Sequence, residues 1–399
     1  MTASQSRRDF VKMAATGVLG VAVGAVAGNY YGSQTQPAET ITETKTVTET
    51  QPPHISDYTV SLRAVAEAKG INIGSAVDAL CLDTQHYGNA QIYANTLARE
   101  FNYVTPEYQM QWGEVHPGLN DWNFTLVDDI ANFAINHQMK LRGHSLIWGY
   151  GSAIPLYLTP TISNDEFRQI VENHIKTLVG HYKGKIRAWD VVNEALDESG
   201  ELSKTLFLEK MGKNYIADVF HMAHEADPSA ILLYQEYGAE GLNPKSNGQY
   251  KLVKDLVKEG VPIDGVALQM HLAAIDQPPY IITMSKSSPN LTLQDISKNI
   301  ARLTDLGLKV EIAEMDLQIR NLSGDLPERL KLQRKIYHDV IDTCLKQKGF
   351  TDITFWGVSD ANSWVDNFFG PDDPLLFDDK YKPKPAYWGV LQALLESTV

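Results

Sequence analysis

The chain has 399 residues, of which 43% are hydrophobic, and its formal net charge is −14. This length is ordinary for one barrel of alternating strands and helices, and the hydrophobic content supports a sizeable core. A protein with a pI of about 5.2 repels phosphate backbones, so nucleic acid is not expected as a partner. The two cysteines, Cys81 and Cys344, allow at most one disulfide and form no metal-binding pattern, so we expect two buried thiols.

Residues 1–28 have the pattern of a twin-arginine export signal. Arg7 and Arg8 are followed by an apolar stretch rich in Gly and Ala that ends near Gly28. This stretch is short for a membrane span, which needs roughly 20 residues. Ala25 to Ala27 offer a cleavage site, and an uncleaved N-terminal anchor is the alternative. We therefore expect a secreted or cell-surface protein, exported in folded form, that contacts a membrane only through such an anchor.

Residues 29–56 form a low-complexity linker. The segment includes "TQPAETITETKTVTETQPP", which is rich in Thr and bounded by Pro. Such a composition cannot bury a core and is typical of a spacer. The folded part is accordingly expected to span residues 57–399.

The folded part alternates between strand-like runs and amphipathic helical segments. Helical segments include "VDDIANFAINHQ", "FRQIVENHIKTLVGHY" and "YIADVFHMAHEADP", and the strand-like runs are "GINIGSAVD", "FNYVTPEY", "KLRGHSLIW", "IRAWDVVNE", "ILLYQEYG", "DGVALQMH", "KVEIAEMD" and "DITFWGVSD". Eight such runs predict an α/β fold of the (β/α)8 TIM-barrel class, with a single catalytic domain. An open doubly wound sheet is the alternative, although no glycine-rich phosphate loop follows the first run.

Polar and aromatic residues gather where the predicted strands end. In a barrel of this type the carboxyl ends of all strands open on one face, and that face carries the active site. The residues expected there are Glu107, His144, Trp148, Asn193, Glu194, Glu236, Tyr237, Gln269, His271, Glu314, Asp316 and Trp356. Two carboxylates in a cleft lined by Trp are the groups that cleave a glycosidic bond. The sequence contains no HExxH, P-loop or GxSxG motif, so we expect neither a metal nor another cofactor.

Several of these segments occur in the order found in one enzyme family. "WDVVNEALDE", "LQMHL", "IAEMD" and "WGVSDANSW" make the chain, from about residue 60 to 395, resemble glycoside hydrolase family 10, the family of endo-β-1,4-xylanases. The resemblance implies that Glu194 is the acid/base and Glu314 the nucleophile. It also implies that His271 and Asp316 orient the nucleophile, and that the sugar is contacted by Asn193, Gln269, Trp356 and Trp364.

The mechanism that this resemblance implies is a retaining double displacement on xylan. Such a reaction needs the two carboxyl groups about 5 to 5.5 Å apart. The expected partner is therefore a polysaccharide, and we expect the enzyme to be a monomer.

The chain departs from the family pattern on the side that binds the glycone. The family's T-P-E-N-E-M-K-W appears as "TPEYQMQW", so Tyr108 and Gln111 replace an Asn and a Lys at the −2 sugar, while Glu107 is kept. Gly149 and Gly151 replace a His and a Gln after the third run, and "QEYGAE" replaces N-D-Y-N-x-E. We therefore predict altered glycone-side specificity, such as a substituted xylan or a mixed-linkage glucan. The alternative is that neighbouring groups supply equivalent contacts.

Other interpretations remain for single residues and for the whole chain. His144, Trp148, Trp356 and Trp364 are also compatible with packing roles, and a lone Glu194 with a charge at a helix N-terminus. A catalytically weak glycan-binding protein on the cell surface is a second class of function. A Schiff-base barrel enzyme is a third, but no Lys lies at the end of a predicted strand.

Overall fold

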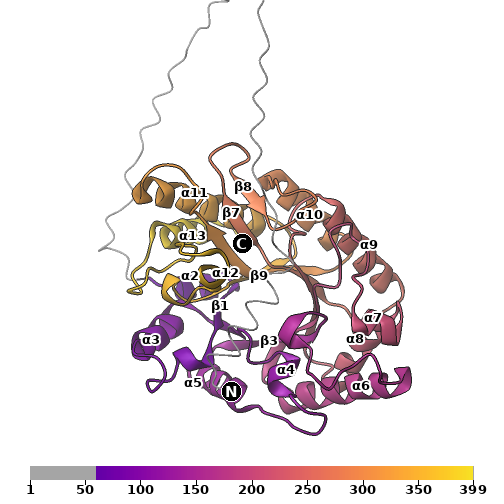
Figure 1. Cartoon of the computed structure of the whole chain (residues 1–399). Helices are drawn as coiled ribbons and strands as arrows, with labels where there is room; N and C mark the ends of the chain where they lie inside the picture. The colour runs from indigo at the N-terminus through magenta and orange to yellow at the C-terminus, as the bar shows by residue number, and fades with distance from the viewer. Residues whose placement is uncertain (1–59, 399) are drawn as a thin grey trace, which may run out of the picture. The chain divides into compact units, whose positions relative to one another are not determined.

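Eight parallel strands close into a barrel in the computed structural model, which describes residues 60–398 (Figure 1). The strands follow one another around the barrel in chain order, and the last one pairs with both its predecessor and the first. This closure confirms the predicted (β/α)8 barrel and rules out the open doubly wound sheet. The strands are β1 (Asn72–Val77), β2 (Tyr103–Pro106), β3 (Lys140–Trp148), β4 (Ile186–Asn193), β5 (Ile231–Glu236), β6 (Gly265–Leu268), β9 (Lys309–Gln318) and β10 (Phe350–Phe355).

The strands bury almost every side chain, because helices cover the outside of the barrel and side chains fill its inside. Every residue of β1 and all but the first of β9 are buried. Parallel strands that are covered on both faces have continuous apolar runs instead of alternating ones. Inside the barrel, Ala188, Leu233, Ala267 and Ala313 form one apolar cluster contributed by four neighbouring strands.

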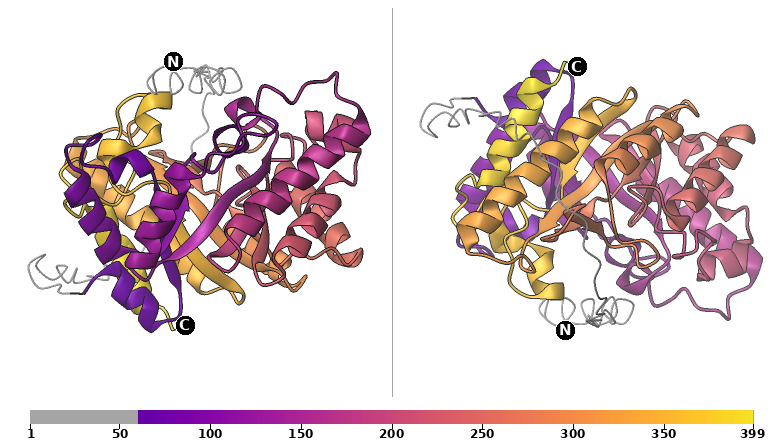
Figure 2. Two further views of the ribbon diagram at one scale, coloured as in Figure 1. Left: turned by 90° about the horizontal axis from the view of Figure 1, so that it is seen from below. Right: turned by 90° about the horizontal axis from the view of Figure 1, so that it is seen from above.

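The helices surround the strands in chain order, and the side views show them lying along the outside of the barrel (Figures 1 and 2). The longer ones start with ordinary capping residues: the Asp325 carboxylate, for example, accepts the backbone N–H of Glu328 at the start of α11. The helices are α2 (Leu62–Ala68), α3 (Ala90–Glu100), α4 (Trp112–Val115), α5 (Thr125–Asn136), α6 (Asn164–His181), α7 (Leu206–Met211), α8 (Tyr215–Ala226), α9 (Pro244–Lys258), α10 (Leu293–Thr304), α11 (Leu326–Leu345), α12 (Trp364–Phe369) and α13 (Pro385–Glu396).

Two short strands beyond the barrel were not predicted. The sequence suggested one run through His271, but β6 ends at Leu268 and a separate strand, β7 (His271–Ala274), starts there. Met270 lies between them with a φ of 63°. The chain then leaves β6, pairs with the outer part of β9, and returns antiparallel as β8 (Ile281–Thr283). This change of partner places His271 opposite Asp316.

The predicted export segment and linker, residues 1–56, lie outside the described residues. The residues from Ser61 onward form one compact unit. Within residues 60–398, none of the helices combines the length and the hydropathy needed to cross a membrane. Cys81 and Cys344 are both buried, as expected.

Candidate active site

The residues predicted at strand ends do lie at the carboxyl ends of the barrel strands. Strand ends point the same way in a parallel barrel, so side chains from distant parts of the sequence come together there. Glu107 follows β2, Trp148 ends β3, Asn193 and Glu194 end and follow β4, Tyr237 follows β5, Gln269 follows β6, His271 starts β7, Glu314 and Asp316 lie in β9, Trp356 follows β10, and Trp364 starts α12.

Glu314 is a buried carboxylate held by an imidazole and an amide. His271 Nε2 lies 3.1 Å from Glu314 Oε2. The Gln235 side-chain amide donates a hydrogen bond to Glu314 Oε1. His144 Nε2 lies 3.8 Å from that same oxygen. Since the Glu314 side chain is only 6% exposed, these neighbours replace water as the partners of its charge.

His271 bridges two of the carboxylates of β9, Glu314 and Asp316. Its Nδ1 lies 2.9 Å from Asp316 Oδ2, and the indole N–H of Trp364 donates to that same oxygen at 2.6 Å. Burial lowers the pKa of His271, but the charges and hydrogen bonds of Asp316 and Glu314 outweigh this effect and raise the pKa to about 10. At neutral pH His271 is therefore a cation that donates one ring N–H to each carboxylate.

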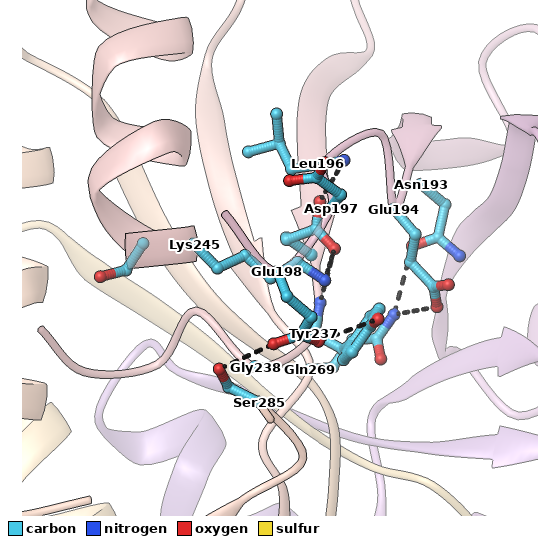
Figure 3. A network of polar contacts seen from close by, with 12 residues as sticks. Asn193, Glu194, Leu196, Asp197, Glu198, Tyr237, Gly238, Lys245, Gln269 and Ser285 are labelled. Atoms are coloured by element: carbon cyan, nitrogen blue, oxygen red, sulfur yellow. Dashed lines mark hydrogen bonds and ion pairs between the residues drawn. The ribbon is translucent and has the colours of Figure 1, made fainter. Parts of the chain in front are cut away.

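Glu194 has neutral hydrogen-bond partners. Gln269 Nε2 donates to Glu194 Oε1 at 2.9 Å, and the indole N–H of Trp148 donates to Oε2 at 3.0 Å. Gln269 Nε2 also lies 3.3 Å from the carbonyl oxygen of the Asn193 side chain. The two carboxylates therefore differ in surroundings: Glu314 has a charged partner, and Glu194 has an amide and an indole. Figure 3 shows the contact between Gln269 and Glu194.

Two glutamines from the intervening strands connect the two carboxylates in a crossed pattern. The backbone N–H of Glu194 donates to the Gln235 carbonyl at 3.0 Å, while the Gln235 side chain reaches Glu314. Conversely, the backbone N–H of Glu314 donates to the Gln269 carbonyl at 3.0 Å, while the Gln269 side chain reaches Glu194. We refer to Gln235 and Gln269 as the crossed amides. Each crossed amide therefore binds one carboxylate with its side chain and the backbone N–H of the other carboxylate residue with its carbonyl.

A buried charged network lies beneath Glu314, and the sequence analysis missed it. Arg142 Nη2 donates to Gln235 Oε1 at 3.0 Å, and Arg142 Nε donates to Asp190 Oδ2 at 2.8 Å. His144 Nδ1 lies 3.0 Å from the same Asp190 oxygen. Because the arginine donates to Gln235 Oε1, the Gln235 amide nitrogen must face Glu314. The signal that was overlooked is a charged residue inside an apolar run, as in "KLRGHS" and "AWDVV".

His144 has a packing role, and its contact with substrate stays a prediction. It is buried and packs edge-to-face against Trp356, with ring centres 5.3 Å apart. Burial lowers its pKa, but Asp190 and Glu314 raise it overall. His144 is therefore part of the packing, and its Nε2 also lies 3.8 Å from Glu314 Oε1.

Comparison with known proteins fits this arrangement. The model of glycosyl hydrolase family 10 matches residues 61–393. The chain belongs to this family. It is 36% identical over 339 residues to endo-1,4-beta-xylanase B of Thermotoga neapolitana, covering 84% of this chain and 92% of the relative. It is 37% identical over 336 residues to the beta-1,4-xylanase of Dictyoglomus thermophilum, covering 80% and 87%. The crystal structure of xylanase 10B from Thermotoga petrophila RKU-1 in complex with xylobiose superposes with a TM-score of 0.77 at 35% identity, covering 85% and 98%.

This family 10 glycoside hydrolase has unusual side chains after β2 and β3. The Tyr108 hydroxyl lies 3.4 Å from Asp78 Oδ1, and Gln111 is only 4% exposed. A Cβ atom added to Gly149 would lie 2.5 Å from Thr205 Cγ2. Thr205 therefore occupies the space into which a side chain at position 149 would point. A side chain at position 149 would therefore require Thr205 to move.

An aromatic and imidazole stack supports the loop after β2. The Trp112 indole lies 3.7 Å from the His174 ring in a parallel stack and donates its N–H to the Tyr157 hydroxyl at 2.8 Å. The Tyr157 hydroxyl also lies 2.9 Å from His116 Nδ1. Burial and the neighbouring His116 hold the pKa of His174 well below its ordinary value, so His174 is neutral.

Tyr237, predicted as a substrate contact, also has partners within the protein. Its ring centre lies 3.1 Å from Lys245 Nζ, and its hydroxyl lies 3.4 Å from Glu198 Oε1. Its contact with a sugar remains a prediction. Across the described residues, His, Cys, Asp and Glu side chains form no group of three or more with metal-binding geometry.

Proposed function

We propose that this chain is a retaining endo-1,4-β-xylanase, with Glu314 as nucleophile and Glu194 as acid/base. The observation that carries the proposal is the contrast between the two carboxylates. Glu314 accepts a hydrogen bond from the cationic His271, and Glu194 has neutral partners at the end of β4. The relatives named as xylanases, 36% and 37% identical over most of the chain, support xylan as the substrate.

In the first step the Glu314 carboxylate attacks the anomeric carbon of the −1 sugar. The glycosidic C–O bond breaks, and the proton of Glu194 passes to the departing oxygen. His271 keeps the second oxygen of Glu314 in place through its 3.1 Å contact. Asn193 is the candidate donor to the sugar 2-hydroxyl, a bond that strengthens in the transition state.

In the second step Glu194 acts as a base. It takes a proton from water, the water oxygen bonds to the anomeric carbon, and Glu314 leaves as a carboxylate. The charge returning to Glu314 is received by His271 and by the Gln235 amide. The same groups therefore stabilise the free nucleophile before the reaction and after it.

The test is reducing-end release from glucuronoxylan by the full chain and by Glu314→Ala. We expect release by the full chain and a loss of about a thousandfold or more in the variant. A folded full chain that releases nothing from xylan would contradict the proposal. A panel of other β-glycans and a binding assay would then separate a different substrate from a binding-only protein.

We also propose that the glycone side has altered specificity. The supporting observations are the aromatic Tyr108 in place of an amide, the buried neutral Gln111 in place of a cation, and the filling of the position 149 space by Thr205. Each charged hydrogen bond that is lost without replacement costs about 1.5–3 kcal/mol. Weaker retention of an undecorated −2 xylose follows from this.

The test compares kcat/KM on linear xylan, glucuronoxylan and mixed-linkage glucan. The variant Tyr108→Asn/Gln111→Lys, which restores the family residues, is expected to gain at least threefold on linear xylan relative to the other two substrates. An unchanged ratio between the three substrates would show that neighbouring groups already supply equivalent contacts.

We further propose that residues 1–28 direct export by the twin-arginine route. The paired Arg7 and Arg8 and the apolar stretch after them support this proposal. Expression of the full chain and of Arg7→Lys/Arg8→Lys in a bacterial host should show export of the first and retention of the second. Equal export of both would contradict the proposal, and N-terminal sequencing of the exported protein distinguishes cleavage from anchoring.

A further inference from the structure

A buried ion pair lies behind the acid/base segment, and the reaction described above does not use it. Glu236 ends β5, and Lys245 lies in the first turn of α9. Both side chains are 0% exposed, and their charged atoms are 2.9 Å apart. Removing such a pair from water costs so much that an apolar replacement is often equally stable. A gain in stability alone therefore does not explain its presence.

Glu236 holds the backbone of the acid/base segment. The N–H of Leu196, two residues after Glu194, donates to Glu236 Oε2 at 3.1 Å. The Tyr234 hydroxyl donates to the same oxygen at 2.7 Å, and the Tyr237 N–H donates to Oε1 at 3.2 Å. The Glu236 carboxylate therefore contacts Tyr234 of β5, the Tyr237 N–H after β5 and the Leu196 N–H of the acid/base segment. It also forms the ion pair with Lys245 of α9.

The backbone at Glu194 needs such support. Its φ is 57°, in the left-handed region that residues with a Cβ atom adopt rarely. An unfavourable conformation of this kind persists only where the surroundings fix it. On one side the N–H of Glu194 is held by the Gln235 carbonyl, and on the other the N–H of Leu196 is held by Glu236.

The two carboxylates also affect each other through charge. Burial raises the pKa of Glu236, Lys245 opposes that rise and the charge of Glu194 adds to it, which gives a pKa of about 7. The charged and titratable groups around Glu236 are Glu194, Lys245, Tyr150, Tyr215, Tyr234 and Tyr237.

We propose that Glu236 is a positioning residue for the acid/base Glu194, and that Lys245 is the cation that holds Glu236 in place. Glu236 acts through its hydrogen bond from the Leu196 backbone N–H, and it does not touch the substrate. The inference rests on the proposed function, because it concerns proton donation by Glu194. Its loss should therefore matter only where the leaving group needs a proton.

The test compares two substrates that share the −1 and −2 sugars. Phenyl β-xylobioside needs a proton on its leaving oxygen, whereas 2,4-dinitrophenyl β-xylobioside leaves without one. The variant is Glu236→Gln/Lys245→Met, which removes both buried charges together and keeps the space filled. We expect kcat/KM to fall at least tenfold on the phenyl substrate and less than threefold on the dinitrophenyl substrate.

The chain offers a matched control in a second buried pair. The Asp360 carboxylate lies 2.6 Å from Lys384 Nζ and accepts the backbone N–H of Leu375 at 2.8 Å. Burial raises the pKa of Asp360 to about 7 against the opposing effect of Lys384, as for Glu236. Asp360→Asn/Lys384→Met removes a buried carboxylate–ammonium pair of the same kind from the segment that follows β10. It should leave the ratio between the two substrates unchanged.

An equal loss on both substrates in the Glu236/Lys245 variant, or no loss on either, overturns the proposal. If the double variant does not fold, Tyr234→Phe removes a single hydroxyl from the same carboxylate. It should lower kcat/KM twofold to fivefold on the phenyl substrate alone, and an equal effect on both substrates again overturns the proposal. An unmodified chain that is inactive on xylan and on both aryl substrates would instead contradict the proposed function.

Discussion

Replacing His271 should remove a large part of the pH dependence of stability above neutrality. His271 is buried between Glu314 and Asp316, and its pKa is raised to about 10 by these carboxylates in spite of burial. A histidine in the unfolded chain has a pKa of about 6.5. The folded state therefore binds a proton that the unfolded state releases as the pH rises. The resulting stability is fully present below pH 6.5 and is lost as the pH approaches 10.

The size of this contribution follows from the two pKa values. Each pH unit between them is worth about 1.36 kcal/mol, so the full difference is roughly 3 to 5 kcal/mol. Because the His271 side chain is only 6% exposed, solvent screening does not reduce this figure much. About 3 kcal/mol should be lost between pH 6.5 and 9. That is a large part of the 5–15 kcal/mol by which folded domains are typically stable.

The measurement is urea unfolding of the full chain and of His271→Asn at several pH values from 6 to 9.5. We expect the free energy of unfolding to fall steeply with pH in the unmodified chain and to fall clearly less between pH 7 and 9.5 in the variant, where Glu236 and Asp360 keep their smaller contributions near pH 7. His221→Asn is the control, since His221 is an exposed residue of α8. An equal fall in the unmodified chain and in His271→Asn would refute the assignment of a raised pKa to His271.

Three further outcomes follow from the described contacts. Trp148→Phe removes the indole N–H that donates to Glu194 at 3.0 Å, so kcat on xylan should fall roughly tenfold to a hundredfold, and a fall below threefold would contradict the role. Gly149→Ala places a Cβ 2.5 Å from Thr205 Cγ2 and should destabilise the fold by about 1–3 kcal/mol in urea unfolding, with recovery when Thr205→Ser is added. His174 is buried with a lowered pKa, so below pH 6.5 only the unfolded state gains a proton on this residue, and the free energy of unfolding should fall as the pH is lowered. His174→Gln should make this fall shallower. An unchanged slope in the variant would contradict the lowered pKa of His174.

Much of the fold was predictable because buried parallel strands leave a clear pattern. The eight strand-like runs coincide with the eight barrel strands to within a few residues at each end, and the functional groups follow the strands directly. The short strands β7 and β8 were not predictable, because they exist only through pairing with the outer part of β9. Segments of three or four residues with ordinary composition contain no sequence signal that predicts such pairing.

The placement of a candidate site residue was predictable where the residue lies next to its own strand end. Segments that resemble the family motifs contain Glu194, Glu314, His271 and Gln269. Gln235 was seen only as a departure from the family pattern, because its reach to Glu314 depends on Arg142 from two strands away. Interactions of this kind depend on the position of a strand around the barrel, which the sequence of either segment alone does not contain.

The crossed amides make the spacing of the two carboxylates independent of the loops that determine substrate preference. The main-chain bonds at Gln235 and Gln269 tie both carboxylates to strands β4, β5, β6 and β9, and none of these bonds involves the loops after β2 and β3. The reacting distance is thus inherited from strand pairing, which loop sequence does not alter. New substrate preferences can evolve by exchange of these two loops while the distance between the catalytic carboxylates stays the same. Grafting the corresponding loops between relatives is therefore a practical route to new specificity.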